Sequence, residues 1–163
     1  MGSFLSRNEN IRIWIIEDNS GDLLLLQETL LDLNFTSRNI RPFTDLLELK
    51  EALKNDQPDV ILLDLFLPGF SGIETFENVM TMSPSSPIIV LSGLDNMETA
   101  LACVSKGAQD YIIKGEMDEE LINKTINYSI ERFKNTIELQ KSEEKYRQLF
   151  TAIPVAVLSL DGA

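Results

Sequence analysis

The sequence contains no histidine and a single cysteine in 163 residues. Without imidazole, the chain supplies no histidine base, no histidine metal ligand and no phosphohistidine of its own. Cys103 has no partner for an internal disulfide, and the apolar helical pattern around it, with Leu101 and Val104, favours a small buried side chain. These features fit a reducing compartment, and we expect a cytoplasmic protein.

Long apolar runs and basic residues are also scarce. Apolar stretches such as 23–26 and 60–63 are far shorter than the roughly 20 residues that cross a bilayer. Residues 1–10 are polar and lack the apolar core of a signal peptide. The chain has 14 Lys and Arg against 26 Asp and Glu, a formal net charge of -12. Such a surface repels phosphate backbones and anionic lipid, so we expect cation binding and no direct nucleic-acid or membrane binding.

The remaining composition is that of a globular domain, because 44% of the residues are hydrophobic and 25% are charged. Short apolar runs alternate with amphipathic stretches five times. We expect strands at 11–16, 39–43, 60–63, 88–91 and 109–113, with Ser20 capping the first helix and residues 94–106 forming one helix. Strands that alternate with helices predict an α/β fold, a parallel sheet covered by helices on both faces.

The last predicted helix continues beyond the expected end of this domain. Its apolar residues recur at three- and four-residue steps as far as Phe133 and Ile137, and no glycine or proline intervenes before Pro154. A second copy of the helix could cover this stripe, so we predict a homodimer seam at Phe133 and Ile137. The expected organisation is an N-terminal segment at 1–10, a domain at 11–130, a helical linker at 131–145 that could form a coiled coil, and a further segment at 146–163.

Polar and charged residues follow four of the predicted strands at their carboxyl ends. They are Glu17 and Asp18 after the first strand, Asp64 after the third, Ser92 after the fourth and Lys114 after the fifth. In an open parallel sheet, ligands bind at this edge, so these side chains are expected to converge. Three converging carboxylates repel one another unless a cation joins them, and oxygen ligands without His or Cys suit Mg²⁺.

Asp64 is the candidate nucleophile of this cluster. A carboxylate can attack phosphorus without a general base and form an acyl phosphate. Mg²⁺, Lys114 and the Ser92 hydroxyl would then surround the charge and the acceptor oxygens of the phosphoryl group. Taken singly, Glu17-Asp18-Asn19 is typical of a turn with a helix cap, and Lys114 of a solvated charge. Their joint placement at the ends of separate strands favours a functional site.

Four segments, in this order, resemble the receiver domain of response regulators over about residues 11–133. They are Ile15 to Asn19, Val60 to Leu65 with the following Pro68, Gly69, Ser71 and Gly72, Ile89 to Gly93, and Gly107 to Lys114. The resemblance implies a flavodoxin-like doubly wound fold with five parallel strands in the order 2-1-3-4-5, extended here by a long C-terminal helix. It also implies that Asp64 is the phosphoacceptor.

The same resemblance implies roles for other residues. Glu17, Asp18, Asp64 and the backbone carbonyl of Phe66 correspond to the Mg²⁺ ligands of the family. Ser92 and Tyr111 correspond to its switch hydroxyl and switch aromatic residue, and Lys114 to its invariant lysine. A histidine kinase or a phosphotransfer protein is the implied phosphoryl donor. The chain would therefore act as a phosphorylation-controlled switch rather than as an enzyme.

Three features of this site are particular to the sequence. Phe66 and Leu94 occupy the positions that flank the path of the hydrolytic water in receivers, and both are apolar and bulky. Neither can orient a water molecule, so slow self-dephosphorylation is expected. Gly115 follows Lys114 where the family usually has proline after a cis peptide bond, and Glu17 stands where aspartate is common.

The end of the chain carries a second resemblance. Residues 142–150 with Ile153 and Pro154 resemble the entry to a PAS sensor domain, so that 146–163 would begin a domain continuing in a longer protein. Two alternative functions stay open: a receiver-fold module that dimerises without phosphorylation, and a phosphohydrolase with Asp64 as nucleophile. Phe66 stands where such hydrolases commonly have a second acid, which disfavours the phosphohydrolase.

Overall fold

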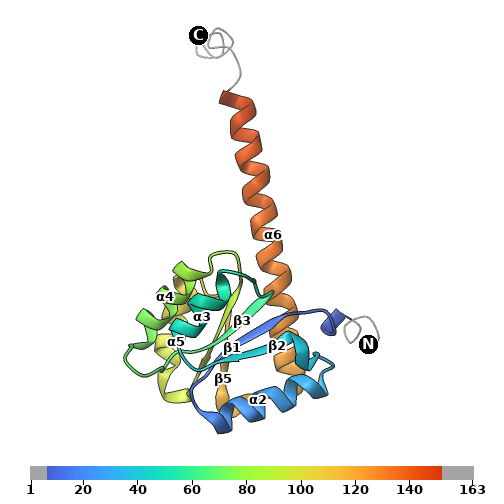
Figure 1. Ribbon diagram of the computed structural model, residues 1–163. Coiled ribbons are helices and arrows are strands. Elements are labelled where there is room, and N and C mark those ends of the chain that lie inside the picture. Colours follow the sequence, from blue (N-terminus) through green and yellow to red (C-terminus); the bar gives the residue numbers. More distant parts are fainter. Residues whose placement is uncertain (1–6, 152–163) are drawn as a thin grey trace. The chain divides into compact units, whose positions relative to one another are not determined.

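The computed structural model describes residues 7–151 (Figure 1). The elements are β1 (Ile13–Ile16), α2 (Ser20–Asp32), β2 (Ile40–Phe43), α3 (Leu46–Leu53), β3 (Val60–Asp64), α4 (Gly72–Met82), β4 (Ile88–Ser92), α5 (Met97–Ser105), β5 (Asp110–Ile113) and α6 (Glu119–Thr151). Short 3-10 turns lie at Ser37–Asn39, Leu94–Asn96 and Lys114–Glu116. The chain divides into two compact units between Ile130 and Glu131.

The first unit is built on one parallel sheet of five strands in the order β2-β1-β3-β4-β5. Every residue of β1, β3 and β4 is buried, as expected for central strands with helices on both faces. The predicted flavodoxin-like doubly wound fold and its strand order are confirmed. The first strand starts at Ile13, two residues later than predicted.

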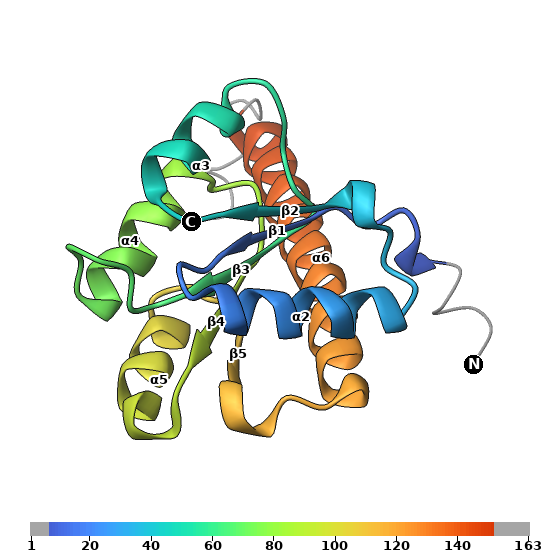
Figure 2. The same cartoon turned by 60° about the horizontal axis from the view of Figure 1, so that its bottom comes forward.

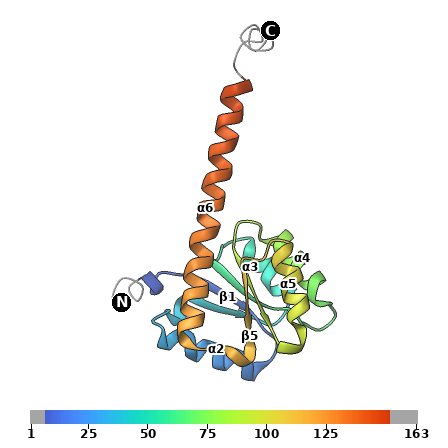
Figure 3. The ribbon, with the colours of Figure 1, turned by 180° about the vertical axis from the view of Figure 1, so that it is seen from behind.

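Successive side chains of each strand enter two separate apolar layers, because side chains alternate across a sheet. Trp14, Ile16, Ile61 and Leu63 pack with α3, α4 and α5 on one face. Ile13, Ile15, Val60 and Leu62 pack with α2 and the first turns of α6 on the other. Figures 2 and 3 show α2 beside the start of α6 on this second face. The two layers fix the strand ends that carry the polar side chains.

Two local expectations from the sequence are wrong. Asn19, not Ser20, caps α2, since its Oδ1 accepts a hydrogen bond of 2.9 Å from the Asp22 backbone N–H. The helix predicted at 94–106 starts three residues later, because Leu94–Asn96 form a 3-10 turn before α5. The Ser92 hydroxyl lies within hydrogen-bond distance of the carbonyl oxygens of Gly93 and Asn96, which holds this loop outside the helix.

The segment before β1 is part of the folded unit from residue 7 onward. Asn8 is fully buried, and its side-chain amide donates to the Leu33 carbonyl at 2.8 Å and to Asn123 Oδ1 at 2.9 Å. The Asn127 amide donates to Asn8 Oδ1 at 3.2 Å. The Glu9 carbonyl accepts two further side-chain hydrogen bonds from residues before β2. We call Asn8, Asn123 and Asn127 the asparagine cluster; it joins the chain before β1 to α2 and α6.

The second unit contains the rest of α6, which continues to Thr151. Phe133 and Ile137 are half-buried. Other large apolar side chains of this unit are exposed: Leu139, Tyr146, Leu149 and Phe150.

The predicted boundary between 145 and 146 falls inside α6, and residues 152–163 of the PAS-like segment lie outside the described residues. Among residues 7–151, no helix combines the length and apolar character that crossing a membrane requires.

Candidate functional site

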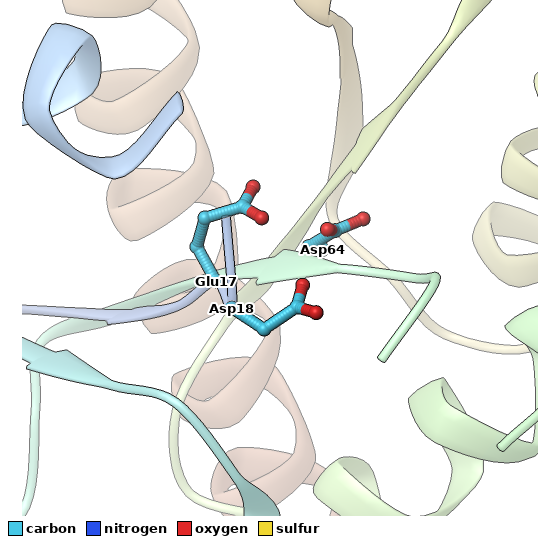
Figure 4. A group of neighbouring side chains, drawn as sticks. All are labelled: Glu17, Asp18 and Asp64. Atoms are coloured by element: carbon cyan, nitrogen blue, oxygen red, sulfur yellow. The ribbon is translucent and has the colours of Figure 1, made fainter. Parts of the chain in front are cut away.

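The carboxyl ends of β1 and β3 bring three carboxylates together. Glu17 and Asp18 directly follow β1, and Asp64 is the last residue of β3. These strands are hydrogen-bonded neighbours, which places their ends side by side. One carboxylate oxygen from each residue lies within 4.8 Å of the others, and Figure 4 shows the three side chains gathered at the end of β3. The convergence predicted from the sequence is present.

Two of the carboxylates are buried and held by backbone hydrogen bonds. Glu17 is 1% exposed, and its Oε1 accepts from the Asn19 N–H at 3.1 Å. Asp64 is also buried, and its Oδ1 accepts from the Phe66 N–H at 3.1 Å. Asp18 is exposed. The cluster therefore has a buried inner side, formed by Glu17 and Asp64, and a side open to solvent at Asp18.

Lys114 joins the site from the end of β5. Its Nζ lies 2.8 Å from Glu17 Oε2, 3.1 Å from Asp22 Oδ2 and 3.2 Å from Asp64 Oδ2. Burial opposes its positive charge, but the hydrogen bonds to Glu17 and Asp22 and the nearby carboxylate charges outweigh burial and raise the pKa of Lys114 above its ordinary value. Lys114 is therefore a fixed cation beside the buried oxygens.

The carboxylate charge exceeds what Lys114 can balance. Burial raises the pKa of Glu17 from 4.5 to about 7, and the hydrogen bond with Asp64 adds to this rise, while Lys114 and the Asn19 N–H oppose it. A group of three carboxylates without histidine or cysteine ligands is the donor set that hard divalent cations prefer. Glu17, Asp18 and Asp64 thus fit Mg²⁺ by donor chemistry and by convergence.

The two predicted switch residues, Ser92 and Tyr111, lie on β4 and β5. Ser92, the last residue of β4, is fully buried, and its hydroxyl lies 3.0 Å from the Gly93 carbonyl oxygen and 3.1 Å from that of Asn96. This hydroxyl is thus bonded to its own loop. Tyr111 in β5 is half-buried and packs against the apolar layer under α3, α4 and α5.

The apolar residues at the predicted water path are both accessible. Phe66 is 44% exposed and Leu94 65% exposed. A Cβ at Gly72 would lie 2.7 Å from Thr99 Cγ2 and 3.6 Å from the tip of the Phe66 ring, so a larger residue at the start of α4 would force the Thr99 side chain to move. Among the described residues no peptide bond is cis, so the bond before Gly115 is trans.

One residue of this site was missed at the sequence level. Asp22, in the first turn of α2, contacts Lys114 although 92 positions separate them in the sequence. The available signal was its place in the first turn of the helix that starts at the site, four positions after Asp18.

The family model of the response regulator receiver domain matches residues 13–126 of this chain. The chain belongs to this family. The receiver is 27% identical over 119 residues to the DNA-binding transcriptional regulator NtrC of Escherichia coli K12, an alignment that covers 71% of this chain and 25% of NtrC. The receiver therefore spans about a quarter of the length of that curated relative.

Solved structures agree with this fold. The N-terminal receiver domain of a response regulator from Bacteroides fragilis matches with a TM-score of 0.65 and 20% identity, over 73% of this chain and 95% of that one. The receiver domain of the sensor histidine kinase PA1611 from Pseudomonas aeruginosa, which has a magnesium ion in its active-site cleft, matches with a TM-score of 0.61 and 20% identity, over 74% and 97%. At these identities the likeness is one of fold.

Proposed function

We propose that this receiver is the phosphoacceptor module of a two-component signalling protein. Asp64 accepts a phosphoryl group from a histidine kinase or a phosphotransfer protein in a reaction that requires Mg²⁺. The observation that supports this most directly is the arrangement around Asp64, with Lys114 Nζ at 3.2 Å and the carboxylates of Glu17 and Asp18 beside it. Lys114 supplies positive charge for a phosphoryl group directly, and Glu17 and Asp18 would do so through the Mg²⁺ that they would hold.

In the proposed transfer, an oxygen of Asp64 forms a bond to phosphorus while the phosphorus–nitrogen bond to the donor histidine breaks. The electron pair of the broken bond stays on the donor nitrogen. Glu17, Asp18, Asp64 and the Phe66 backbone carbonyl would hold Mg²⁺, which neutralises charge on the transferred oxygens. Lys114 would supply further positive charge, since its ammonium already contacts Asp64.

The conformational signal would start at Ser92. Its hydroxyl now bonds to its own loop, and a phosphoryl oxygen on Asp64 would be a stronger, charged acceptor. Movement of Ser92 toward Asp64 would leave space that Tyr111 fills, shifting a pre-existing equilibrium at the surface of α5, β5 and α6. The chain itself would act as a switch and not as an enzyme of turnover.

We further propose that α6 carries this signal to a PAS-like output domain in a cytoplasmic protein. Phe133 and Ile137, half-buried in the second unit, remain the proposed seam of a parallel homodimer. A dimer of this kind would hold two output domains side by side.

The test is incubation of the full chain with Mg²⁺ and a small phosphodonor, followed by intact-mass measurement. We expect wild type and an Asp32→Asn control, altered at the exposed end of α2, to gain the mass of one phosphoryl group. An Asp64→Asn variant should gain none. The proposal is wrong if wild type gains none, which would favour the phosphorylation-independent module. Rapid catalytic release of phosphate would instead indicate a phosphohydrolase.

A further inference from the structure

Carboxylates surround the ammonium group of Lys114 and can accept all three of its N–H donors. An ammonium has three N–H donors, and Nζ has three carboxylate partners, Glu17 at 2.8 Å, Asp22 at 3.1 Å and Asp64 at 3.2 Å. Two of these partners belong to the group of converging carboxylates that fits a metal ion, whereas Asp22 lies outside it. Asp22 is thus the one partner in this set whose charge a bound cation would not share.

Occupation of the metal site changes the balance of forces on Lys114. A divalent cation held by Glu17 and Asp64 would draw their oxygens toward itself and would repel the ammonium group. Asp22 would keep its full attraction for Lys114. Without it, the long lysine side chain would be pushed toward solvent at the moment when its charge is needed beside Asp64.

We propose that Asp22 is a positioning residue for phosphoryl transfer, which keeps the Lys114 ammonium beside Asp64 when a divalent cation occupies the site. This inference rests on the proposed phosphoacceptor function. Asp22 does not touch the transferred group; it acts by holding one N–H of Lys114 while the other two become available to the phosphoryl oxygens.

The backbone at Asp22 is fixed in a way that suits this role. Its N–H donates to Asn19 Oδ1 at 2.9 Å, and the Asn19 N–H donates to Glu17 Oε1 at 3.1 Å. The loop from the metal ligand to the helix is therefore a connected set of hydrogen bonds. The Asp22 side chain is 47% exposed, so solvent screens its attraction for Lys114 in part. An ion pair of this kind contributes about a two- to fivefold effect on an equilibrium or a rate.

A simpler role for Asp22 makes a different prediction. An acidic residue in the first turn of a helix interacts favourably with the helix dipole. If this were all that Asp22 did, its replacement would lower the melting temperature and would leave the position of Lys114 and the rate of transfer unchanged.

The test compares Asp22→Asn, Asp22→Glu and, as a control, Glu28→Gln, which removes one exposed negative charge farther along α2. One readout is the rate of phosphorylation of the full chain by a small phosphodonor at saturating Mg²⁺. The other is the NMR signal of the Lys114 ammonium group with Mg²⁺ and no phosphodonor, since a held ammonium exchanges its protons with water slowly and a solvated one exchanges them fast.

We expect Asp22→Asn to react about two- to fivefold more slowly than wild type and to lose the ammonium signal in Mg²⁺. Asp22→Glu should recover both in part, and Glu28→Gln should match wild type. Equal rates and signals in wild type and Asp22→Asn would overturn the inference, as would a faster Asp22→Asn variant or a change in melting temperature alone. If wild type is not phosphorylated at all, the proposed function fails, whereas the ammonium signal still decides whether Asp22 holds Lys114.

Discussion

The buried carboxyl group of Glu17 predicts an unusual pH dependence of stability for the metal-free protein. Its pKa rises from 4.5 to about 7 on folding, chiefly because of burial. The folded state therefore binds this proton more tightly than the unfolded state does. The resulting stabilisation is complete below about pH 4.5 and is lost as the pH rises through about 7.

The magnitude follows from the size of the shift. One pKa unit corresponds to about 1.4 kcal/mol, so ionising Glu17 in the folded, metal-free protein costs on the order of 3 kcal/mol. Glutamine has the shape of protonated glutamate and does not ionise. Glu17→Gln should therefore be more stable than wild type by about 3 kcal/mol at pH 8, and the two should be nearly equal at pH 4.5.

The assay is urea unfolding in the presence of a chelator, followed by the fluorescence of Trp14, the single tryptophan, which is 2% exposed in the fold. Unfolding curves at several pH values give the free energy of unfolding of wild type, of Glu17→Gln and of a Glu28→Gln control. If the free energies of unfolding of wild type and Glu17→Gln change in parallel with pH, burial does not raise the pKa of Glu17. Addition of Mg²⁺ should reduce the difference between them, because a cation stabilises the ionised carboxylate.

Four further outcomes are expected. Millimolar Mg²⁺ should raise the melting temperature of wild type, and Asp64→Asn should raise metal-free stability while weakening this effect; an unchanged wild-type curve would count against the metal site. Ser92→Ala should still be phosphorylated but should lose any phosphorylation-dependent change in dimerisation, and a variant that behaves like wild type would disprove the coupling. Phe66→Asn combined with Leu94→Glu should shorten the lifetime of the phosphorylated state, measured by its decay in excess Mg²⁺; equal decay of wild type and double variant would contradict the water-path argument. A chain that ends near Arg132 should associate more weakly in sedimentation than the full chain, whereas equal association would place the dimer interface on the receiver itself.

The sheet and the carboxylate cluster could be predicted because their signals are local in the sequence. Residues 60–63 are uniformly apolar, as a strand buried on both faces must be, and Asp64 follows directly. Once the strands are recognised as parallel, topology alone brings Glu17, Asp18 and Asp64 to one edge. No side-chain conformation has to be known for this step.

Features that depend on side-chain conformation were not predictable in the same way. To predict the contact between Asp22 and Lys114, one must know how the flexible lysine side chain runs from the end of β5 to α2. The loop after β4 is shaped by the Ser92 hydroxyl, which bonds to carbonyls rather than to solvent. The sequence predicts the cap of α2 one residue too late, because Asn19 and Ser20 are both good capping residues and only the backbone conformation decides between them.

The asparagine cluster bears on where this receiver can be cut or joined to other proteins. Asn8 lies before residues 13–126, the span matched by the family model, yet it is fully buried. A chimaera that starts at residue 13 would remove the Asn8 amide from the Leu33 carbonyl and from Asn123 Oδ1, whereas the Asn127 amide would keep its hydrogen bonds to Asn123. A buried polar group that loses its partner costs about 1–3 kcal/mol. The unit that can be exchanged intact is therefore longer than the unit that sequence similarity delimits, and fusions should retain the chain from residue 7.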